Sequence, residues 1–270
     1  MIMPLVCCLL LFGGGFLAAG FLLPFFLDTA SVPAALKPNW RGKLIPGTAG
    51  LVFPVLLSLV CLPLVQNGAR DKSLIIFMFA VYGAAFLGLV DDMMGDAGPR
   101  GLTGHFGRLF RKRKISTGVV KALGTGVIAL WVVLYEQGST MGLDWLLLLL
   151  CVNFINLLDL RPGRAVKGTI FLFALSLLLP IGDYRFLSAA AGILIAYARY
   201  DLRGEVMLGD TGSNALGMAA GLVLLQAPFL AKLLLAAGLM VFQLACEKYS
   251  FSRIIEKNEW LRKIDRWGRD

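Results

Sequence analysis

Long apolar runs separated by short charged segments are the feature that most limits how this chain can fold. The run from Leu5 to Leu27 contains no charged residue, and about 20 consecutive apolar residues are enough to cross a bilayer as a helix. Hydrophobic residues make up 58% of the chain and the mean hydropathy is +0.76, which is unlike a soluble domain. The pattern predicts an integral membrane protein whose first run is retained as a span rather than removed as a signal peptide.

The apolar runs predict an all-α, polytopic fold with about nine transmembrane helices. We expect the spans at 5–27, 47–65, 73–90, 117–136, 144–159, 169–182, 186–199, 211–227 and 229–246. Several are shorter than the roughly 20 residues that a straight span needs, so we expect their ends to continue into the flanking polar residues. This divides the chain into a transmembrane domain over 1–246 and a basic amphipathic tail over 247–270, which we expect to lie on the membrane.

The distribution of basic residues predicts the orientation in the membrane. The 26 Lys and Arg lie in one alternating set of loops, at one helix start and in the tail, except for Arg70, Lys72, Arg185 and Lys232. By the positive-inside rule the N-terminus is outside, and the basic loops and the C-terminus are cytoplasmic. This topology accounts for most of the net charge of +9. We expect no nucleic-acid partner, because no basic surface with stacking residues is evident.

The stretch Leu208–Gly217 is polar and glycine-rich although it lies between two strongly apolar segments. It reads Leu-Gly-Asp-Thr-Gly-Ser-Asn-Ala-Leu-Gly. Polar groups at the edge of a membrane span cost free energy unless something binds them. A simple helix N-cap by Asp210 or Thr211 is the structural alternative. The same place suits an anion, because the backbone N–H groups of a helix start are unpaired.

A pair of carboxylates, Asp91 and Asp92, follows the third predicted span. Adjacent acids at the end of an apolar helix repel each other and are tolerated where a cation or a divalent metal neutralises them. Such a pair can hold Mg²⁺ or supply a general base; solvated loop acids are the alternative. Arg100, Arg108, Arg111, Lys112, Arg113 and Lys114 follow the pair, and then Lys121 at the start of span four. Acids beside so many cations favour phosphate chemistry with a metal.

Asn153, Asn156 and Asp159 recur at a spacing of three at the end of the fifth predicted span. This spacing places two amides and a carboxylate on one helical face. Hydrogen bonds between neighbouring membrane helices are the structural alternative. That alternative does not explain why the row ends beside Arg161 and Arg164.

The remaining cytoplasmic loops add weaker signals. Asp201 lies in the loop before the glycine-rich stretch, and Arg41 and Lys43 precede a Pro-Gly turn that reads most simply as a basic juxtamembrane turn. His105 is the only histidine, so we expect it to contact phosphate or solvent rather than build a metal site. Acids and amides gather at the cytoplasmic ends of several spans, which points to a metal-assisted active site.

With these motifs the chain resembles the polyprenyl-phosphate N-acetylhexosamine-1-phosphate transferases, the superfamily that includes phospho-N-acetylmuramoyl-pentapeptide transferase. The resemblance rests on the Asp-Asp pair, the Asn-x-x-Asn-x-x-Asp row and Gly-Asp-x-Gly-Ser-x-x-Leu-Gly, in family order and on the predicted cytoplasmic side. It implies a multi-span enzyme of the bacterial inner membrane, with a cytoplasmic active site. Such an enzyme moves a sugar-1-phosphate from a UDP-sugar to a polyprenyl phosphate with Mg²⁺ and releases UMP.

The resemblance assigns roles by motif. Asp210 corresponds to the principal Mg²⁺ ligand and Asn156 to a second. Asp91 and Asp92 match the catalytic pair, one of which deprotonates or orients the lipid phosphate. Lys121 resembles the lysine near the pyrophosphate, and Asp159 matches the first acid of the family's Asp-Gly-x-Asp-Gly motif. The residues expected to bind substrate are Asn153, Arg161, Arg164, Asp201, Gly209, Ser213, Arg41 and Lys43.

The chain also departs from the family pattern. Pro162 stands where the family has the second acid of Asp-Gly-x-Asp-Gly, an acid tied to nucleotide reading, and a late histidine-rich motif is absent. Asp96 follows Gly95, where many members have a third acid. Arg161 and Arg164 are candidates to replace the lost pyrophosphate contacts.

Two alternatives stay open. A relative without turnover would bind polyprenyl phosphate or act as a scaffold for envelope enzymes, and a transporter would relay ions through its acids. We rank the transporter last, because the acids lie at one rim and not at the middle of the bilayer. A homodimer is left open.

Overall fold

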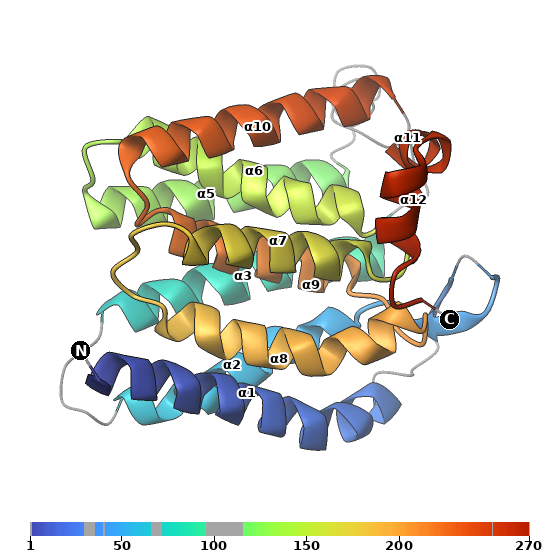
Figure 1. Cartoon of the computed structure of the whole chain (residues 1–270), viewed down its shortest axis with the longest axis horizontal. Coiled ribbons are helices and arrows are strands. Elements are labelled where there is room, and N and C mark those ends of the chain that lie inside the picture. Colours follow the sequence, from blue (N-terminus) through green and yellow to red (C-terminus); the bar gives the residue numbers. More distant parts are fainter. Residues whose placement is uncertain are drawn as a thin grey trace.

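The structure, a computed structural model, describes residues 2–29, 36–39, 41–65, 72–95, 116–249 and 251–269. Helices dominate this part of the chain, and all but the two short ones of the tail run along roughly one common direction (Figure 1). They are α1 (Ile2–Thr29), α2 (Val52–Val65, preceded by the 3-10 turn η2 at Ala49–Leu51), α3 (Lys72–Met94), α5 (Thr117–Glu136), α6 (Met141–Leu158), α7 (Arg164–Leu177), α8 (Arg185–Leu202), α9 (Gly209–Leu224), α10 (Phe229–Lys248), α11 (Phe251–Lys257) and α12 (Glu259–Arg266).

The helical membrane class expected from the sequence is confirmed. Each predicted span overlaps a helix, although 169–182 extends past the end of α7 at Leu177. Five helices in the described part of the chain, α1, α3, α5, α6 and α10, are long and apolar enough to cross a bilayer. The others that match predicted spans are shorter or less apolar. The crossing of all nine, and the orientation, therefore stay predictions.

Helix α9 is the centre of the bundle. It packs against α3, α6, α7 and α8, and nearly all of its residues are buried. Small residues allow this close packing: a side chain at Gly88 of α3 would overlap the backbone of Asp210, and one at Gly217 would overlap the backbone of Val152 in α6. Because other helices surround α9, its 16 residues need not match the thickness of the bilayer.

A second close pair, α1 and α8, forms one side of the bundle (Figure 1). Gly15 of α1 faces the backbone of Ala189, and Gly192 of α8 faces the backbone of Phe12. Glycines at both crossing points let the two backbones approach, as small residues commonly do between membrane helices.

A short β-hairpin is the element that the all-α prediction missed. Strand β1 (Leu36–Pro38) pairs antiparallel with β2 (Leu44–Pro46), at the end of the bundle that also carries α11 and α12 (Figure 1). In the turn, Gly42 has φ +77°, and the Asn39 side-chain oxygen accepts hydrogen bonds from the backbone N–H groups of Arg41 and Lys43. An Asn followed by a Gly in this way is a turn signal.

The tail folds back across that end of the bundle. Helices α11 and α12 cross the direction of the long helices and lie beside the start of α7 (Figure 1). Helix α7 begins at Arg164, five residues before the predicted span, because its first turn packs against the tail through buried side chains. The outer face of α12 exposes Trp260, Ile264 and Trp267. Membrane contact of the tail stays a prediction.

Candidate active site

Three predicted site residues from three helices meet at one ammonium group. The Lys121 Nζ atom of α5 lies 2.8 Å from Asp91 Oδ2 of α3 and 2.5 Å from Asp210 Oδ2 of α9. Thr117 also hydrogen-bonds to the Asp91 side chain. The two carboxylates are thus held together by a cation between them, which offsets their mutual repulsion.

Asn156 of α6 completes this layer. Its side-chain nitrogen donates to Asp210 Oδ1 at 2.5 Å and to Ser213 Oγ at 3.1 Å. The row Asn153–Asn156–Asp159 therefore brings one amide to the carboxylate that the sequence analysis placed at the centre of the site. Rotating the Asn156 amide would turn its oxygen toward the same space.

Asp92 has a different position from Asp91, although the two are neighbours in the chain. Its carboxylate accepts the backbone N–H groups of Asp210 (3.1 Å) and Thr211 (2.9 Å) and the Thr211 hydroxyl (2.7 Å). It also pairs with Lys37 of the hairpin at 2.7 Å, and it is almost fully buried. Asp92 therefore caps the start of α9, and Asp91 is the member of the pair that faces Lys121.

Gly209 provides the room that this arrangement needs. It has φ +66°, a backbone conformation that favours glycine. A side chain here would overlap the carbonyl oxygen of Gly47 and crowd the Asp92 carboxylate. The structure thus places Gly209 against the protein backbone at the start of α9.

A pocket of about 360 Å³ opens beside Lys121 and Asn156. It lies between α5, α6, α9 and α10, and most of its wall is apolar. Asn153, expected to bind substrate, lines it. The complete lining is Gly118, Lys121, Ala122, Thr125, Leu146, Leu149, Leu150, Val152, Asn153, Asn156, Leu157, Asn214, Met240 and Gln243.

Asp201 is buried behind the loop that follows α6. Its Oδ2 accepts the backbone N–H of Gly163 at 2.6 Å, which fixes the turn before α7. Burial raises the pKa of Asp201 to about 7, although this hydrogen bond and the charges of Arg269 and Lys167 oppose the rise. Asp159, at the end of α6, is close enough to feel the charge of Asp201. Asp201 therefore stabilises the backbone of the loop between α6 and α7.

The two arginines of this loop contact the tail. Arg164 is buried, and its guanidinium donates to both carboxylate oxygens of Asp265 at 2.7 and 3.1 Å and to Ser252 Oγ at 2.8 Å. Arg161 makes a single exposed ion pair of 3.1 Å with Glu256. In this structure both side chains hold α11 and α12 and not the Lys121 cluster.

The other predicted residues fall at the edge of the site or outside the described residues. Arg41 and Lys43 are exposed in the hairpin turn. Asp96, Arg100, His105 and the basic residues at 108 and 111–114 lie in 96–115, outside the part of the chain that the structure describes. Sequence reasoning missed Lys37, because only the hairpin brings it to Asp92.

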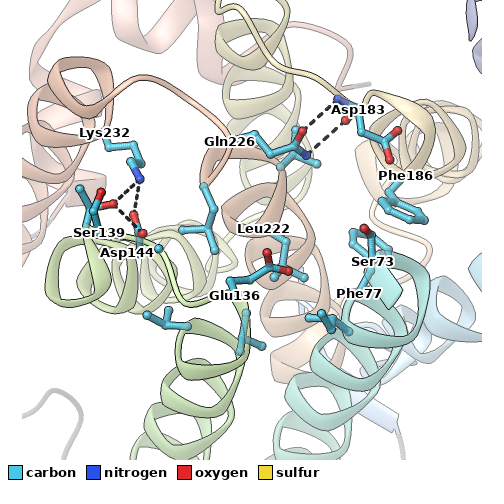
Figure 2. A pocket seen from close by; sticks show the side chains of 17 residues that line it. Ser73, Phe77, Glu136, Ser139, Asp144, Asp183, Phe186, Leu222, Gln226 and Lys232 are labelled. Atoms are coloured by element: carbon cyan, nitrogen blue, oxygen red, sulfur yellow. Dashed lines mark hydrogen bonds and ion pairs between the residues drawn. The ribbon is translucent and has the colours of Figure 1, made fainter. Parts of the chain in front are cut away.

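A second pocket, of about 480 Å³, lies at the opposite end of the bundle (Figure 2). Lys232 pairs there with Asp144 at 2.6 Å, and the Thr140 hydroxyl bonds to both of them. Gln226 exchanges hydrogen bonds with the backbone of Asp183. None of the predicted site residues lines this pocket.

The oxygen atoms around Lys121 suit a hard divalent cation. No cluster of three or more His, Cys, Asp or Glu side chains with the geometry to hold a metal occurs within the described ranges. Mg²⁺ does not need such a cluster, because it binds through one or two carboxylates plus substrate phosphates and water. Asp210, Asp91 and the Asn156 amide supply oxygen donors, and the ammonium between the carboxylates marks a place that already stabilises positive charge. These residues fit Mg²⁺.

Comparison with known proteins gives one distant similarity. The chain is 26% identical over 212 residues to a phospho-N-acetylmuramoyl-pentapeptide-transferase from Shouchella clausii (strain KSM-K16). The match covers 72% of this chain and 63% of that protein, so the chain spans less than two thirds of its relative. No protein-family model matches the chain. The similarity supports the superfamily that the motifs indicate.

Proposed function

We propose that this protein is a membrane phosphotransferase that moves a sugar-1-phosphate from a nucleotide-sugar to polyprenyl phosphate. The observation that carries the proposal is the convergence of Asp91, Lys121, Asn156 and Asp210 from four helices at the mouth of a largely apolar pocket. Charged groups beside an apolar cavity suit a substrate that has an anionic head and a hydrocarbon chain. The distant transferase relative supports the same reaction kind.

The reaction joins two anions, so its main obstacle is charge. An oxygen of the lipid phosphate attacks the phosphorus that carries the sugar, and a new P–O bond forms. The bond from that phosphorus to the bridging oxygen breaks, and the nucleoside monophosphate leaves with the bridging oxygen and the electron pair. Lys121 would neutralise phosphate charge, and Asp91 would orient the attacking phosphate or take its proton.

Asp210 and Asn156 would hold Mg²⁺ in this proposal, with Asp91 close enough to assist. The ion would neutralise phosphate oxygens when bound. Asp92 would be a positioning residue. It fixes the start of α9 and so the direction of the Asp210 side chain. The chain's own contribution is therefore a rigid frame of oxygen donors and one ammonium.

The donor is proposed to be a UDP-N-acetylhexosamine and the acceptor undecaprenyl phosphate, at the cytoplasmic face of a bacterial inner membrane, in the synthesis of a cell-envelope glycan. The motifs and the distribution of basic residues support these assignments. Pro162 and the contact of Arg164 with the tail argue that any nucleotide is read by residues other than those usual in the superfamily.

The test is turnover with a matched variant. Purified protein is incubated with Mg²⁺, polyprenyl phosphate and a panel of nucleotide-sugars, and release of nucleoside monophosphate is measured. We expect turnover that chelation stops and that Asp210→Asn lowers at least 100-fold. Glu256→Gln, an exposed change in the tail, is the control and should retain activity. Full turnover by Asp210→Asn, or none by the wild type with any donor, would contradict the proposal.

A lipid-phosphate-binding protein without turnover is the second candidate. It is favoured by the loop after α6, which has Pro162 and whose arginines are engaged by the tail. Binding of polyprenyl phosphate that survives chelation, in a protein inactive with every donor, would select this function.

A further inference from the structure

The site has two layers. Lys121, Asn156 and Asp210 form the outer layer at the end of the bundle. Thr125 follows Lys121 by four residues in α5, Asn214 follows Asp210 by four in α9, and Asn153 precedes Asn156 by three in α6. Each is one helical turn, about 5 Å, further into the bundle. All three line the pocket of about 360 Å³.

Two atoms of the inner layer lack a partner among the residues that the structure describes. Asn214 is 1% exposed and Thr125 is 4% exposed. Neither Asn214 Nδ2 nor Thr125 Oγ1 makes a hydrogen bond to any described residue. A buried polar group without a partner costs about 1–3 kcal/mol, and such groups in folded proteins usually bond to protein, water or ligand. Since both residues line the pocket, a side-chain rotation would let these two atoms meet an occupant of the pocket.

We propose that Thr125 and Asn214 bind the phosphate of the lipid acceptor from the membrane side. Both groups donate hydrogen bonds, so they suit the non-bridging oxygens of a phosphate that Lys121 contacts from the other side. This inference rests on the proposed function and assigns two residues that determine where the acceptor's head stops in the pocket. Water can satisfy the same atoms until the acceptor displaces it.

The chemistry of the two groups favours a phosphate over other occupants at this depth. Mg²⁺ binds through one or two carboxylates, whereas the inner layer offers only a hydroxyl and neutral amides. A hydrocarbon chain offers no acceptor for an N–H or O–H group, and the apolar wall of Leu146, Leu149 and Met240 already accommodates it. The phosphate is the part of the acceptor that gains from this inner layer.

The test measures binding of the acceptor without Mg²⁺ or donor. Wild type, Thr125→Val and Asn214→Leu in nanodiscs are titrated with polyprenyl phosphate, with polyprenol of the same length and with inorganic phosphate. Thr125→Ser keeps the hydroxyl, and Thr169→Val is the matched control, since the buried Thr169 bonds the Ala165 carbonyl in α7. Asn214→Asp keeps the size of the side chain and adds a negative charge.

We expect Thr125→Val and Asn214→Leu to weaken polyprenyl phosphate binding about tenfold each, because each removes a hydrogen bond to a charged group. Asn214→Asp should weaken it further, and Thr125→Ser and Thr169→Val should bind as the wild type does. Polyprenol affinity should not change. Free phosphate that binds as tightly as the lipid would mean that the layer recognises phosphate without its chain, and would overturn assignment to the lipid acceptor.

The outcomes separate this inference from the proposed function. If the wild type binds and turns over polyprenyl phosphate but Thr125→Val, Asn214→Leu and Asn214→Asp bind it equally well, the inference is wrong and the proposed function stands. An equal loss of polyprenol binding also overturns it. If the wild type neither binds nor turns over the lipid, both fall. Should Asn214→Leu fail to fold, Thr125→Val and Asn214→Asp decide.

Discussion

At the scale of single residues, the two adjacent carboxylates of α3 have separate jobs. Successive helical residues point about 100° apart, so Asp91 and Asp92 meet different neighbours. Asp91 contacts Lys121, while Asp92 accepts the N–H groups that open α9. The two residues look equivalent in the sequence, but in the fold Asp91 faces the candidate active site and Asp92 caps α9.

This division predicts different effects of two substitutions. Asp91→Asn should lower kcat about 100-fold or more without loss of thermal stability, because it removes the group that we propose acts on substrate. Asp92→Ala should destabilise the fold by about 1–3 kcal/mol, because it leaves the donors of Asp210 and Thr211 unsatisfied. Turnover and thermal unfolding in detergent check both. Equal stability of the two variants would contradict the division.

The buried Asp201 predicts how stability depends on pH. Its pKa in the fold is about 7 against an ordinary value of 3.8, so between these values the folded chain holds a proton that the unfolded chain has released. The contribution of this group to stability is therefore full below about pH 4 and is lost as the pH rises through 7.

Asp201→Asn should remove that dependence, since the amide oxygen can still accept the Gly163 N–H. Compared with the wild type, the variant should gain stability between pH 5 and pH 8, by about 1.4 kcal/mol for each pH unit up to 7. Thermal unfolding at the two pH values measures the difference. Parallel pH profiles for both proteins would show that Asp201 is ionised in the fold at pH 5.

At the scale of elements, α9 and the tail each depend on contacts far away in the chain. Helix α9 can be short because other helices cover it, and its start is fixed by α3, by the hairpin and by the backbone of Gly50, which donates to the Leu208 carbonyl. The tail, in turn, is held by Arg164 and Asp265, which are 4% and 9% exposed. Burial alone would raise the pKa of Asp265. The hydrogen bonds and charges of Arg164 and Arg269 outweigh that effect, so the pKa of Asp265 is below its ordinary value.

The tail contacts predict a large coupling for one ion pair and a small one for another. A double-mutant cycle on Arg164→Met and Asp265→Asn should give about 2 kcal/mol. Asp265→Asn leaves the buried Arg164 charge uncompensated, whereas Arg164→Met leaves Asp265 with Arg269 as its one ion-pair partner among the described residues. The same cycle on Arg161 and Glu256, which are 40% and 57% exposed, should give less than about 1 kcal/mol. Hydrogen exchange in α12 reports its undocking. Similar values for the two pairs would mean that Arg164 does not anchor the tail.

At the scale of the whole molecule, the ends of the helices divide the protein into two faces. One face carries the hairpin and the tail (Figure 1). The Lys121 cluster lies at the same face, at the end of α3 and the starts of α5 and α9. The other carries the Lys232–Asp144 pocket (Figure 2). The helices of the first face start or end with the motif residues, and the positive-inside rule predicts that this face is cytoplasmic.

The orientation can be checked by labelling. After replacement of Cys7, Cys8, Cys61, Cys151 and Cys246, single cysteines are placed at Gln137 and Gly182 on one face and at Arg41 and Glu205 on the other. We expect a membrane-impermeant maleimide to label the first two in intact cells and the second two only after permeabilisation. The reverse pattern would invert the predicted topology and place the site outside.

The sequence by itself determined the membrane class, the helices and the residues that gather at one end of them. Apolar runs of this length leave a helix as the main way to pair the backbone within a bilayer. The motif residues follow because they lie at the ends of those runs: Lys121, Asn156 and Asp210 were all expected and do meet. These features depend on residues close together in the chain, so the sequence pattern predicts them.

Only the tertiary structure decided which partner each side chain has. The rotation of α3 directs Asp91 to the site and Asp92 to α9, the hairpin brings in Lys37, and the returning tail engages Arg164. Asn214 Nδ2 and Thr125 Oγ1, which have no partner among the described residues, are recognised as one layer only when α5 and α9 line one pocket. Each of these contacts joins residues far apart in the chain. These contacts depend on how the helices pack against each other, and the periodicity of a single helix does not predict that packing.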